Sequence, residues 1–161
     1  MENELRKAID LRKNGDNQRP IDQLKQLAQL YLEHAEIQYQ CAWNHDVIAL
    51  EKEAIPFYEK AIQLKGLTRI DLQGAYLGLG STYRTIGAYE ESEALLLLAI
   101  TEFPENKVYS VFLAMTYYNL GKHFKAMEGL LTIISQTING PNLQEYQTAI
   151  AFYTDKLDHV W

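Results

Sequence analysis

The stretch Leu79-Gly80-Ser81-Thr82-Tyr83-Arg84-Thr85-Ile86-Gly87-Ala88-Tyr89 decides the fold, because a matching stretch follows it 34 residues later. The second copy reads Leu113-Ala114-Met115-Thr116-Tyr117-Tyr118-Asn119-Leu120-Gly121-Lys122-His123. An internal period of this length is the signature of a repeat architecture. The sequence therefore predicts a chain built from copies of one structural unit, and weaker copies are expected elsewhere.

Two weaker copies lie upstream of this pair. A small residue recurs in the first helix of each unit, at Gly80, Ala114, Ala42 and Ala8, and a large residue three places later, at Tyr83, Tyr117, His45 and Leu11. The turn residues are predicted at Gly87, Gly121, Glu53 and Gly15, and the small residues of the second helix at Ser92, Ala126, Ala54 and Pro20. The period is 34 except for four extra residues, Lys65-Gly66-Leu67-Thr68. They predict a longer loop, with a capping box that starts the next helix at Arg69.

Apolar residues recur at helical spacing along the whole chain, as in Tyr76, Leu79 and Tyr83. The predicted fold class is all-α, a right-handed superhelical stack of antiparallel helix pairs with about nine helices. Their predicted spans are 2–13, 20–32, 35–49, 51–64, 69–86, 88–102, 105–120, 122–137 and 142–159. Small residues are needed where two helices cross closely, so the recurring Gly and Ala positions are interpreted as packing positions.

Nine residues of segment 71–104 fit one known signature: Tyr76, Leu79, Gly80, Tyr83, Gly87, Tyr89, Leu96, Ala99 and Pro104. The pattern resembles the tetratricopeptide repeat, and the end of the chain resembles that of small bacterial proteins of this kind. The resemblance implies a single domain, 1–161. Its parts are a degenerate repeat 1–34, repeats 35–66, 71–104 and 107–138, and a capping helix 142–159 with Leu143, Tyr146, Ile150, Tyr153 and Leu157 along one face.

Composition narrows the class of function. The 161 residues include 15 Lys plus Arg against 21 Asp plus Glu, a formal charge of −6, with no basic block that would suit nucleic acid. The longest apolar run, 94–100, is far shorter than the roughly 20 residues of a membrane-spanning helix. The start of the chain lacks a signal-peptide pattern, and Cys41 is the one cysteine. These features predict a cytoplasmic protein that binds neither nucleic acid nor membrane.

The chemistry-bearing residues form no recognisable catalytic or metal-binding set. His45-Asp46 could suggest a metal-dependent hydrolase, but that chemistry needs several further His and Asp ligands. No second His-Asp dipeptide exists among the other histidines, His34, His123 and His159. His45 stands where other repeats have Tyr, and Cys41 stands at an apolar position, so both are interpreted as packing residues. The prediction is a protein that is not an enzyme, with no cofactor and no metal.

The resemblance implies that the first helices of successive pairs line a concave surface. It also implies that the residues between the packing positions point into this surface. The candidate partner-binding residues there are Tyr39, Trp43, Asp46, Leu77, Ser81, Arg84, Phe112, Met115, Tyr118 and Asn119. One hypothesis is a groove for a protein or peptide, with Trp43 and Tyr118 as anchors and with Arg84 and Asn119 holding the peptide backbone. The other is a structural self-assembly domain, in which this row is covered by a second copy or by the terminal helix.

Some members of this family hold the carboxylate at the end of chaperones with Lys, Asn and Arg from three successive first helices. This sequence has Arg84 and Asn119 at matching places, but the preceding unit has no Lys-Asn pair. The resemblance therefore predicts that acidic chaperone-like tails do not bind tightly.

Overall fold

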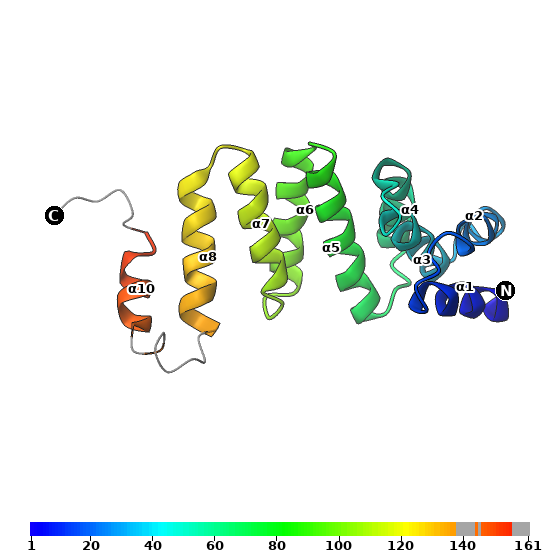
Figure 1. The fold of residues 1–161 in the computed structure, drawn as a ribbon, viewed down its shortest axis with the longest axis horizontal. Helices are drawn as coiled ribbons and strands as arrows, with labels where there is room; N and C mark the ends of the chain where they lie inside the picture. The colour runs from blue at the N-terminus through cyan, green and yellow to red at the C-terminus, as the bar shows by residue number, and fades with distance from the viewer. Residues whose placement is uncertain (138–143, 145, 156–161) are drawn as a thin grey trace. The chain divides into compact units, whose positions relative to one another are not determined.

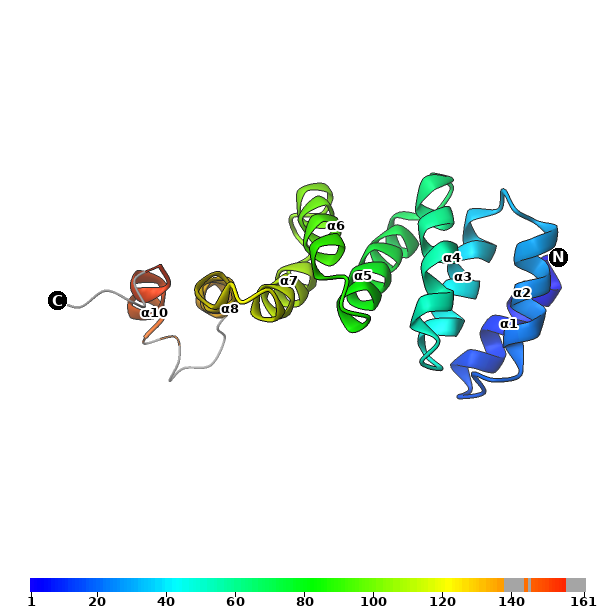
Figure 2. The same ribbon diagram turned by 90° about the horizontal axis from the view of Figure 1, so that it is seen from above.

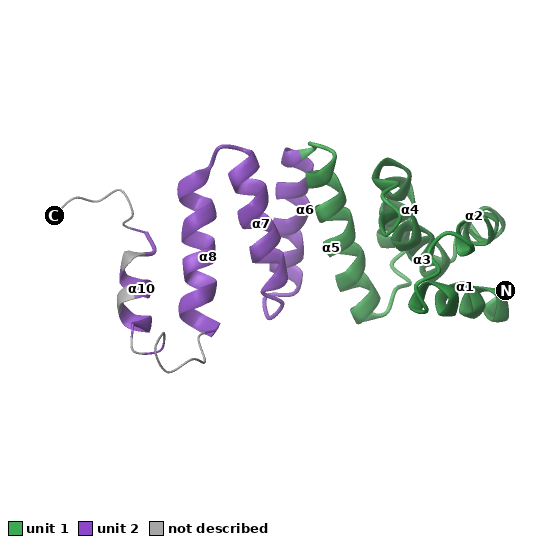
Figure 3. Ribbon diagram, viewed as in Figure 1, with its two compact units in different colours: residues 1–88 green, residues 89–161 purple. Residues whose placement is uncertain are grey.

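The computed structural model describes residues 1–137, 144 and 146–155, and in these residues all regular structure is helical. The chain divides into two compact units, Met1–Ala88 and Tyr89–Trp161 (Figure 3). The boundary falls inside the predicted repeat 71–104, between its two helices. The predicted all-α helical repeat fold is confirmed, and each unit is described below by itself.

The first unit holds five helices: α1 (Glu2–Lys13), α2 (Pro20–Leu30), α3 (Ala35–Asp46), α4 (Glu51–Gln63) and α5 (Arg69–Thr85) (Figure 1). Helix α3 is central, because it packs against α2, α4 and α5 and also touches α1. Its residues Ile37 and Cys41 join Leu24 and Leu27 of α2 in a core from which water is excluded. Burying such apolar side chains contributes roughly 1.5–3 kcal/mol each.

The second unit holds α6 (Tyr89–Glu102), α7 (Val108–Asn119), α8 (His123–Thr137) and α10 (Gln147–Tyr153). Helix α7 packs against both α6 and α8, and α10 lies beside α8 (Figure 2). Leu96, Phe103 and Tyr109 are fully buried, and the rings of Phe103 and Tyr109 pack together with their centroids 6.3 Å apart. The side chain of Gln147 donates a hydrogen bond to the backbone oxygen of Ser135, which ties α10 to α8.

Four helix ends share one turn geometry. In each, a residue in the left-handed region, Gly15, Ala49, Gly87 or Gly121, has a φ between 61° and 86°. The next backbone N–H donates to the carbonyl oxygen five residues earlier, over 2.8–3.0 Å, and this oxygen belongs to the large residue of the repeat. This is the Schellman motif. The turn identifies 1–34 as a helix pair that ends its first helix as the other three pairs do.

The predicted turn residue Glu53 is wrong. Glu53 lies in the first turn of α4, and the left-handed position of this pair is Ala49, with φ 61°. The register shift of four residues lies beyond α4, so Ala49 is the residue that corresponds to Gly87. An alanine there carries a Cβ that crowds the following carbonyl oxygen, which costs about 1–2 kcal/mol.

The helix boundaries follow from their caps. Helix α5 begins at Arg69 as predicted, because the Thr68 hydroxyl accepts the backbone N–H of Asp71 over 3.1 Å and donates to its carboxylate over 2.7 Å. Helix α3 ends at Asp46, three residues before the predicted end at 49, because the chain turns at Ala49. In the extra loop, Lys65 and not Gly66 takes the left-handed conformation.

The predicted terminal helix 142–159 is described only in part. Helix α10 covers Gln147–Tyr153, and turns flank it at Tyr146 and Thr154, so the helix is shorter than predicted. Leu143 and Leu157, two residues of its predicted apolar face, lie outside the described residues. Within the described part of the chain, no helix is both long enough and apolar enough to cross a bilayer.

Candidate functional site

The ten candidate residues divide between the two units. Six belong to the first unit, on α3 and α5: Tyr39, Trp43, Asp46, Leu77, Ser81 and Arg84. Four belong to the second unit, on α7: Phe112, Met115, Tyr118 and Asn119. The six residues on α3 and α5 are named the first-unit surface, and the four residues on α7 are named the second-unit surface.

Trp43 is held between two side chains in the first unit. It stacks on Tyr39 one turn earlier in α3, with ring centroids 5.8 Å apart and planes inclined by 30°. The Arg12 guanidinium of α1 lies over the indole, 3.9 Å from its centroid. Tyr39 is 5% exposed, whereas Trp43 is 40% exposed. A guanidinium over a tryptophan face contributes roughly 0.5–2 kcal/mol, so the exposed indole is fixed in orientation.

Arg12 itself is buried and is anchored on α3. Its guanidinium donates to the backbone oxygen of Gln40 over 3.2 Å and to the side-chain oxygen of the same residue. Burial lowers the pKa of Arg12, and burial raises the pKa of the neighbouring Tyr39 to about 12. The raised pKa keeps the Tyr39 phenol neutral at neutral pH, and an arginine guanidinium is cationic in proteins.

Asp46 joins three helices. Its carboxylate accepts the Tyr58 hydroxyl of α4 and the Thr82 hydroxyl of α5, each over 3.2 Å. Tyr58 is 2% exposed and Thr82 is 1% exposed, while Asp46 is half-buried and reaches solvent. Burial raises the pKa of Asp46, and the two hydroxyl donors oppose that rise. The carboxylate is thus held in one orientation by neutral donors.

Helix α5 approaches α3 and α4 closely because it carries glycines. A Cβ on Gly74 would collide with the Tyr39 hydroxyl, and a Cβ on Gly78 would lie 2.5 Å from the Cζ of Tyr58. Gly74, Gly78 and Thr82 follow one another at four-residue intervals and so lie on one face of the helix. The predicted residues Leu77, Ser81 and Arg84 are half-buried on α5, and Leu77 and Ser81 stand next to this face.

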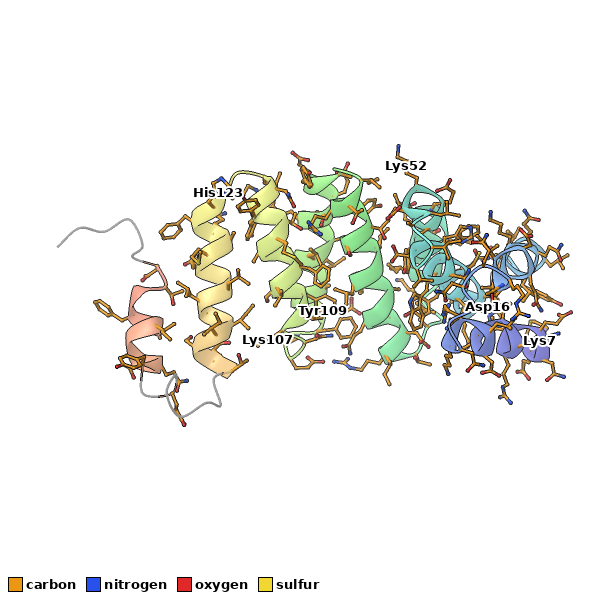
Figure 4. The ribbon with its side chains drawn as sticks, viewed as in Figure 1. Lys7, Asp16, Lys52, Lys107, Tyr109 and His123 are labelled. Carbon is orange, nitrogen blue, oxygen red and sulfur yellow. The ribbon has the colours of Figure 1, made fainter. Side chains whose placement is uncertain are left out.

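The second-unit surface is more open. Tyr118 is 65% exposed and meets the His123 ring edge-on at 5.0 Å; Figure 4 labels His123 at the start of α8. Asn119 is exposed, and Phe112 and Met115 are half-buried. Behind them, the buried Thr116 hydroxyl shares a hydrogen bond of 3.0 Å with Ser92 of α6. The hydroxyl that Ser92 adds at this alanine position thus has a buried polar partner.

His45 and Cys41 are buried packing residues, as their positions in the repeat predict. The Nδ1 of His45 lies 2.7 Å from the backbone oxygen of Cys41, so Nδ1 carries the proton. The ring packs on Phe57 at 5.2 Å, and burial lowers the pKa of His45. Burial raises the pKa of the Cys41 thiol to about 12. A neutral thiol with no exposed surface is a poor nucleophile.

Among the described residues, no group of three His, Cys, Asp or Glu side chains could hold a metal ion. A pocket of about 460 Å³ lies between α7 and α8. Its lining includes Lys107, Tyr117 and Lys125, and none of the ten candidate residues. This pocket therefore lies apart from the candidate residues.

Four residues that support the first-unit surface are absent from the predicted site: Arg12, Tyr58, Gly74 and Gly78. Tyr58 is predicted only as a packing position of the repeat. Arg12 and Tyr58 are joined to the surface by contacts over 31 and 12 residues of sequence, which no period predicts. Two glycines one turn apart inside a helix are a readable signal, because glycine weakens a helix unless a neighbour approaches closely.

Comparison with known families finds a match to the model described as "Tetratrico peptide repeat", over residues 35–157. Comparison with curated protein sequences finds no match. Among solved structures, "MamA 41-end" from Desulfovibrio magneticus RS-1 is similar at 14% identity and a TM-score of 0.74, covering 98% of this chain and 86% of that chain.

A second similar structure is the putative kinesin light chain of Podosopora anserina with "nearly identical TPR-like repeats". Its identity is 17% and its TM-score 0.67, with 97% of this chain and 87% of that chain covered. A "MamA protein" structure reaches 20% identity and a TM-score of 0.71, over 97% and 88% of the two chains. Likenesses at these identities establish a common fold.

Proposed function

The chain belongs to the tetratricopeptide repeat family, and from this premise we propose that it is a non-enzymatic interaction module that binds a polypeptide partner. The first helices of its pairs, α3, α5 and α7, are the elements that meet the partner. The observation that carries the proposal is Trp43. This large aromatic side chain is 40% exposed yet is fixed by Tyr39 and Arg12, and rigid exposed aromatics are typical binding hot spots.

Tyr118 is the corresponding candidate of the second unit. It is the most exposed aromatic side chain of α7, and the exposed Asn119 that follows it is proposed to bond to the backbone of the peptide. Tyr and Trp supply contact area at a low cost in side-chain entropy. The surrounding contacts are proposed to be Leu77, Ser81, Arg84, Phe112 and Met115, and the buried Tyr39 is proposed to support the Trp43 ring.

The test is partner capture by immobilised protein from an extract of the source cell, followed by calorimetry with the purified partner. We expect Trp43→Ala or Tyr118→Ala to weaken binding about thirtyfold, the cost of about 2 kcal/mol typical of a hot spot. Ile70→Ala and Leu98→Ala are matched controls, since both side chains are exposed and apolar but lie outside the candidate surfaces. Equal binding by all four variants would contradict the proposal.

Self-association is a second candidate function, favoured by α8. Phe124, Met127 and Ile134 follow one another at helical spacing and are 37%, 48% and 42% exposed, so α8 presents an apolar stripe. A second copy could cover it. We expect sedimentation at micromolar protein to show a dimer that Met127→Glu dissociates, if this is the function. A monomer at every concentration would exclude it.

A further inference from the structure

One charged group of the first-unit surface lacks a partner of opposite charge. Asp46 bonds only to the neutral hydroxyls of Tyr58 and Thr82, and in the part of the chain that the structure describes it makes no ion pair. Withdrawing a carboxylate partly from water is unfavourable unless a cation or several donors compensate. The side chain is nevertheless held at the surface, in one orientation.

The electric field around Asp46 favours a cation. Glu51, at the start of α4, is the charged group that acts on Asp46, and it raises the pKa of the carboxyl group further. The guanidinium of Arg12 is already engaged by Gln40 and by the indole of Trp43. The chain as a whole carries a formal charge of −6.

The exposed indole stands beside this carboxylate. Trp43 precedes Asp46 by three residues on α3, so the two side chains are neighbours on one helix face. An incoming lysine or arginine side chain has an apolar stem as well as a charged end. The exposed part of Trp43 offers apolar surface for the stem, and Asp46 offers two oxygens for the charged end.

We propose that Asp46 receives a lysine or arginine side chain of the polypeptide partner, whose stem packs on the exposed part of Trp43. This inference rests on the proposed function and names the chemistry that it requires of the partner. Tyr58 and Thr82 are positioning residues, because they hold the carboxylate without touching the partner. The surface then selects a basic segment, in agreement with the acidic balance of the chain.

The probe for this test is the peptide acetyl-Ala-Arg-Ala-amide, compared with the same peptide carrying citrulline, which has the shape of arginine without its charge. In Trp161→Phe protein, Trp43 is the one indole, and its Nε1–H signal reports binding by NMR. We expect the arginine peptide to bind about tenfold more tightly than the citrulline peptide, because bonds to a charged acceptor are the stronger ones.

Three variants separate charge from structure. Asp46→Asn should abolish the preference for arginine, whereas Glu36→Gln, an exposed carboxylate change on the same helix, should keep it. Thr82→Val removes one donor that orients the carboxylate but leaves the charge, so it should reduce the preference for arginine without abolishing it. Equal binding of the two peptides, or an arginine preference that survives in Asp46→Asn, would overturn the inference.

The purified partner distinguishes this inference from the proposed function. If partner binding needs Trp43 but is unchanged in Asp46→Asn, the proposed binding surface stands and the inference that Asp46 binds a cation fails. If partner binding is indifferent to Trp43→Ala, the proposed function fails whatever the peptides show.

Discussion

Gly78 sets how closely α5 approaches Tyr58, and its replacement by alanine is the sharpest test of this packing. A Cβ at Gly78 would lie 2.5 Å from the Cζ and 2.9 Å from the Cε1 of Tyr58, and closer still to its hydroxyl. The ring has little room to withdraw. It is 2% exposed, it donates to Asp46, and its centroid lies 6.2 Å from that of Tyr39.

The magnitude follows from two opposing effects. Overpacking a rigid core typically lowers the free energy of unfolding by 1–3 kcal/mol. Because three atoms of Tyr58 lie within 3 Å of the added Cβ, we expect a cost near the upper end, about 3 kcal/mol. Alanine is the better helix former by about 1 kcal/mol, which offsets part of the cost. We therefore expect Gly78→Ala to lower the free energy of unfolding by about 2 kcal/mol, a shift of about 1 M in the urea midpoint for a chain of this size.

The assay is urea unfolding followed by Trp43 fluorescence in Trp161→Phe protein, so that the first unit is observed directly. Gly129→Ala is the matched control: its Cβ would meet only Ala114, at an ordinary 3.9 Å, and it should stabilise α8 by up to about 1 kcal/mol. In a Tyr58→Leu background the cost of Gly78→Ala should shrink. An unchanged or raised midpoint for Gly78→Ala would refute the packing argument.

Three further predictions concern single residues. Ala49→Gly should raise the free energy of unfolding by up to about 1 kcal/mol, because glycine relieves the left-handed strain; a lower urea midpoint would contradict this. Burial lowers the pKa of His45, so the unfolded chain binds its proton more readily, and stability should be full above the unfolded pKa of about 6.5 and fall below it. Urea midpoints measured against pH should show this fall, and His45→Phe should flatten it. Cys41 should react with a thiol reagent only after urea is added, since it is 0% exposed with a pKa of about 12; rapid reaction of the folded protein would disprove its burial.

The repeat pattern predicted much of the fold because packing positions obey a period. Ala8, Ala42, Gly80 and Ala114 are all buried, as are the small residues of the second helices. The capping box at Thr68 is a local signal, and it placed the start of α5 correctly. The turn at Ala49 was missed because the period of 34 was counted back from Gly87 without the four extra residues 65–68, and because alanine carries no sign of a left-handed conformation.

The candidate surfaces were predicted only from the positions of their residues within the repeat, and these positions do not determine how exposed a side chain is. They placed Tyr39 and Trp43 together, yet Tyr39 is buried beneath the indole and Trp43 is 40% exposed. The difference arises because Tyr39 is packed against Trp43, Tyr58 and Gly74, whereas Arg12 covers only one side of the Trp43 ring. The positions within the repeat also could not show that the carboxylate of Asp46 is held by α4 and α5.

The sequence by itself determined that this chain is a stack of helix pairs, because small residues, large residues and turns recur with one period. It also determined the family. The tertiary structure decided which side chains can meet a partner: Arg12 orients Trp43, two hydroxyls orient Asp46, and Gly74 and Gly78 bring α5 close enough to complete the surface. The physical reason is the distance along the chain over which the interactions act. Helix formation, capping and repeat packing depend on near neighbours in sequence, whereas the orientation and exposure of these side chains depend on contacts between helices far apart in the chain.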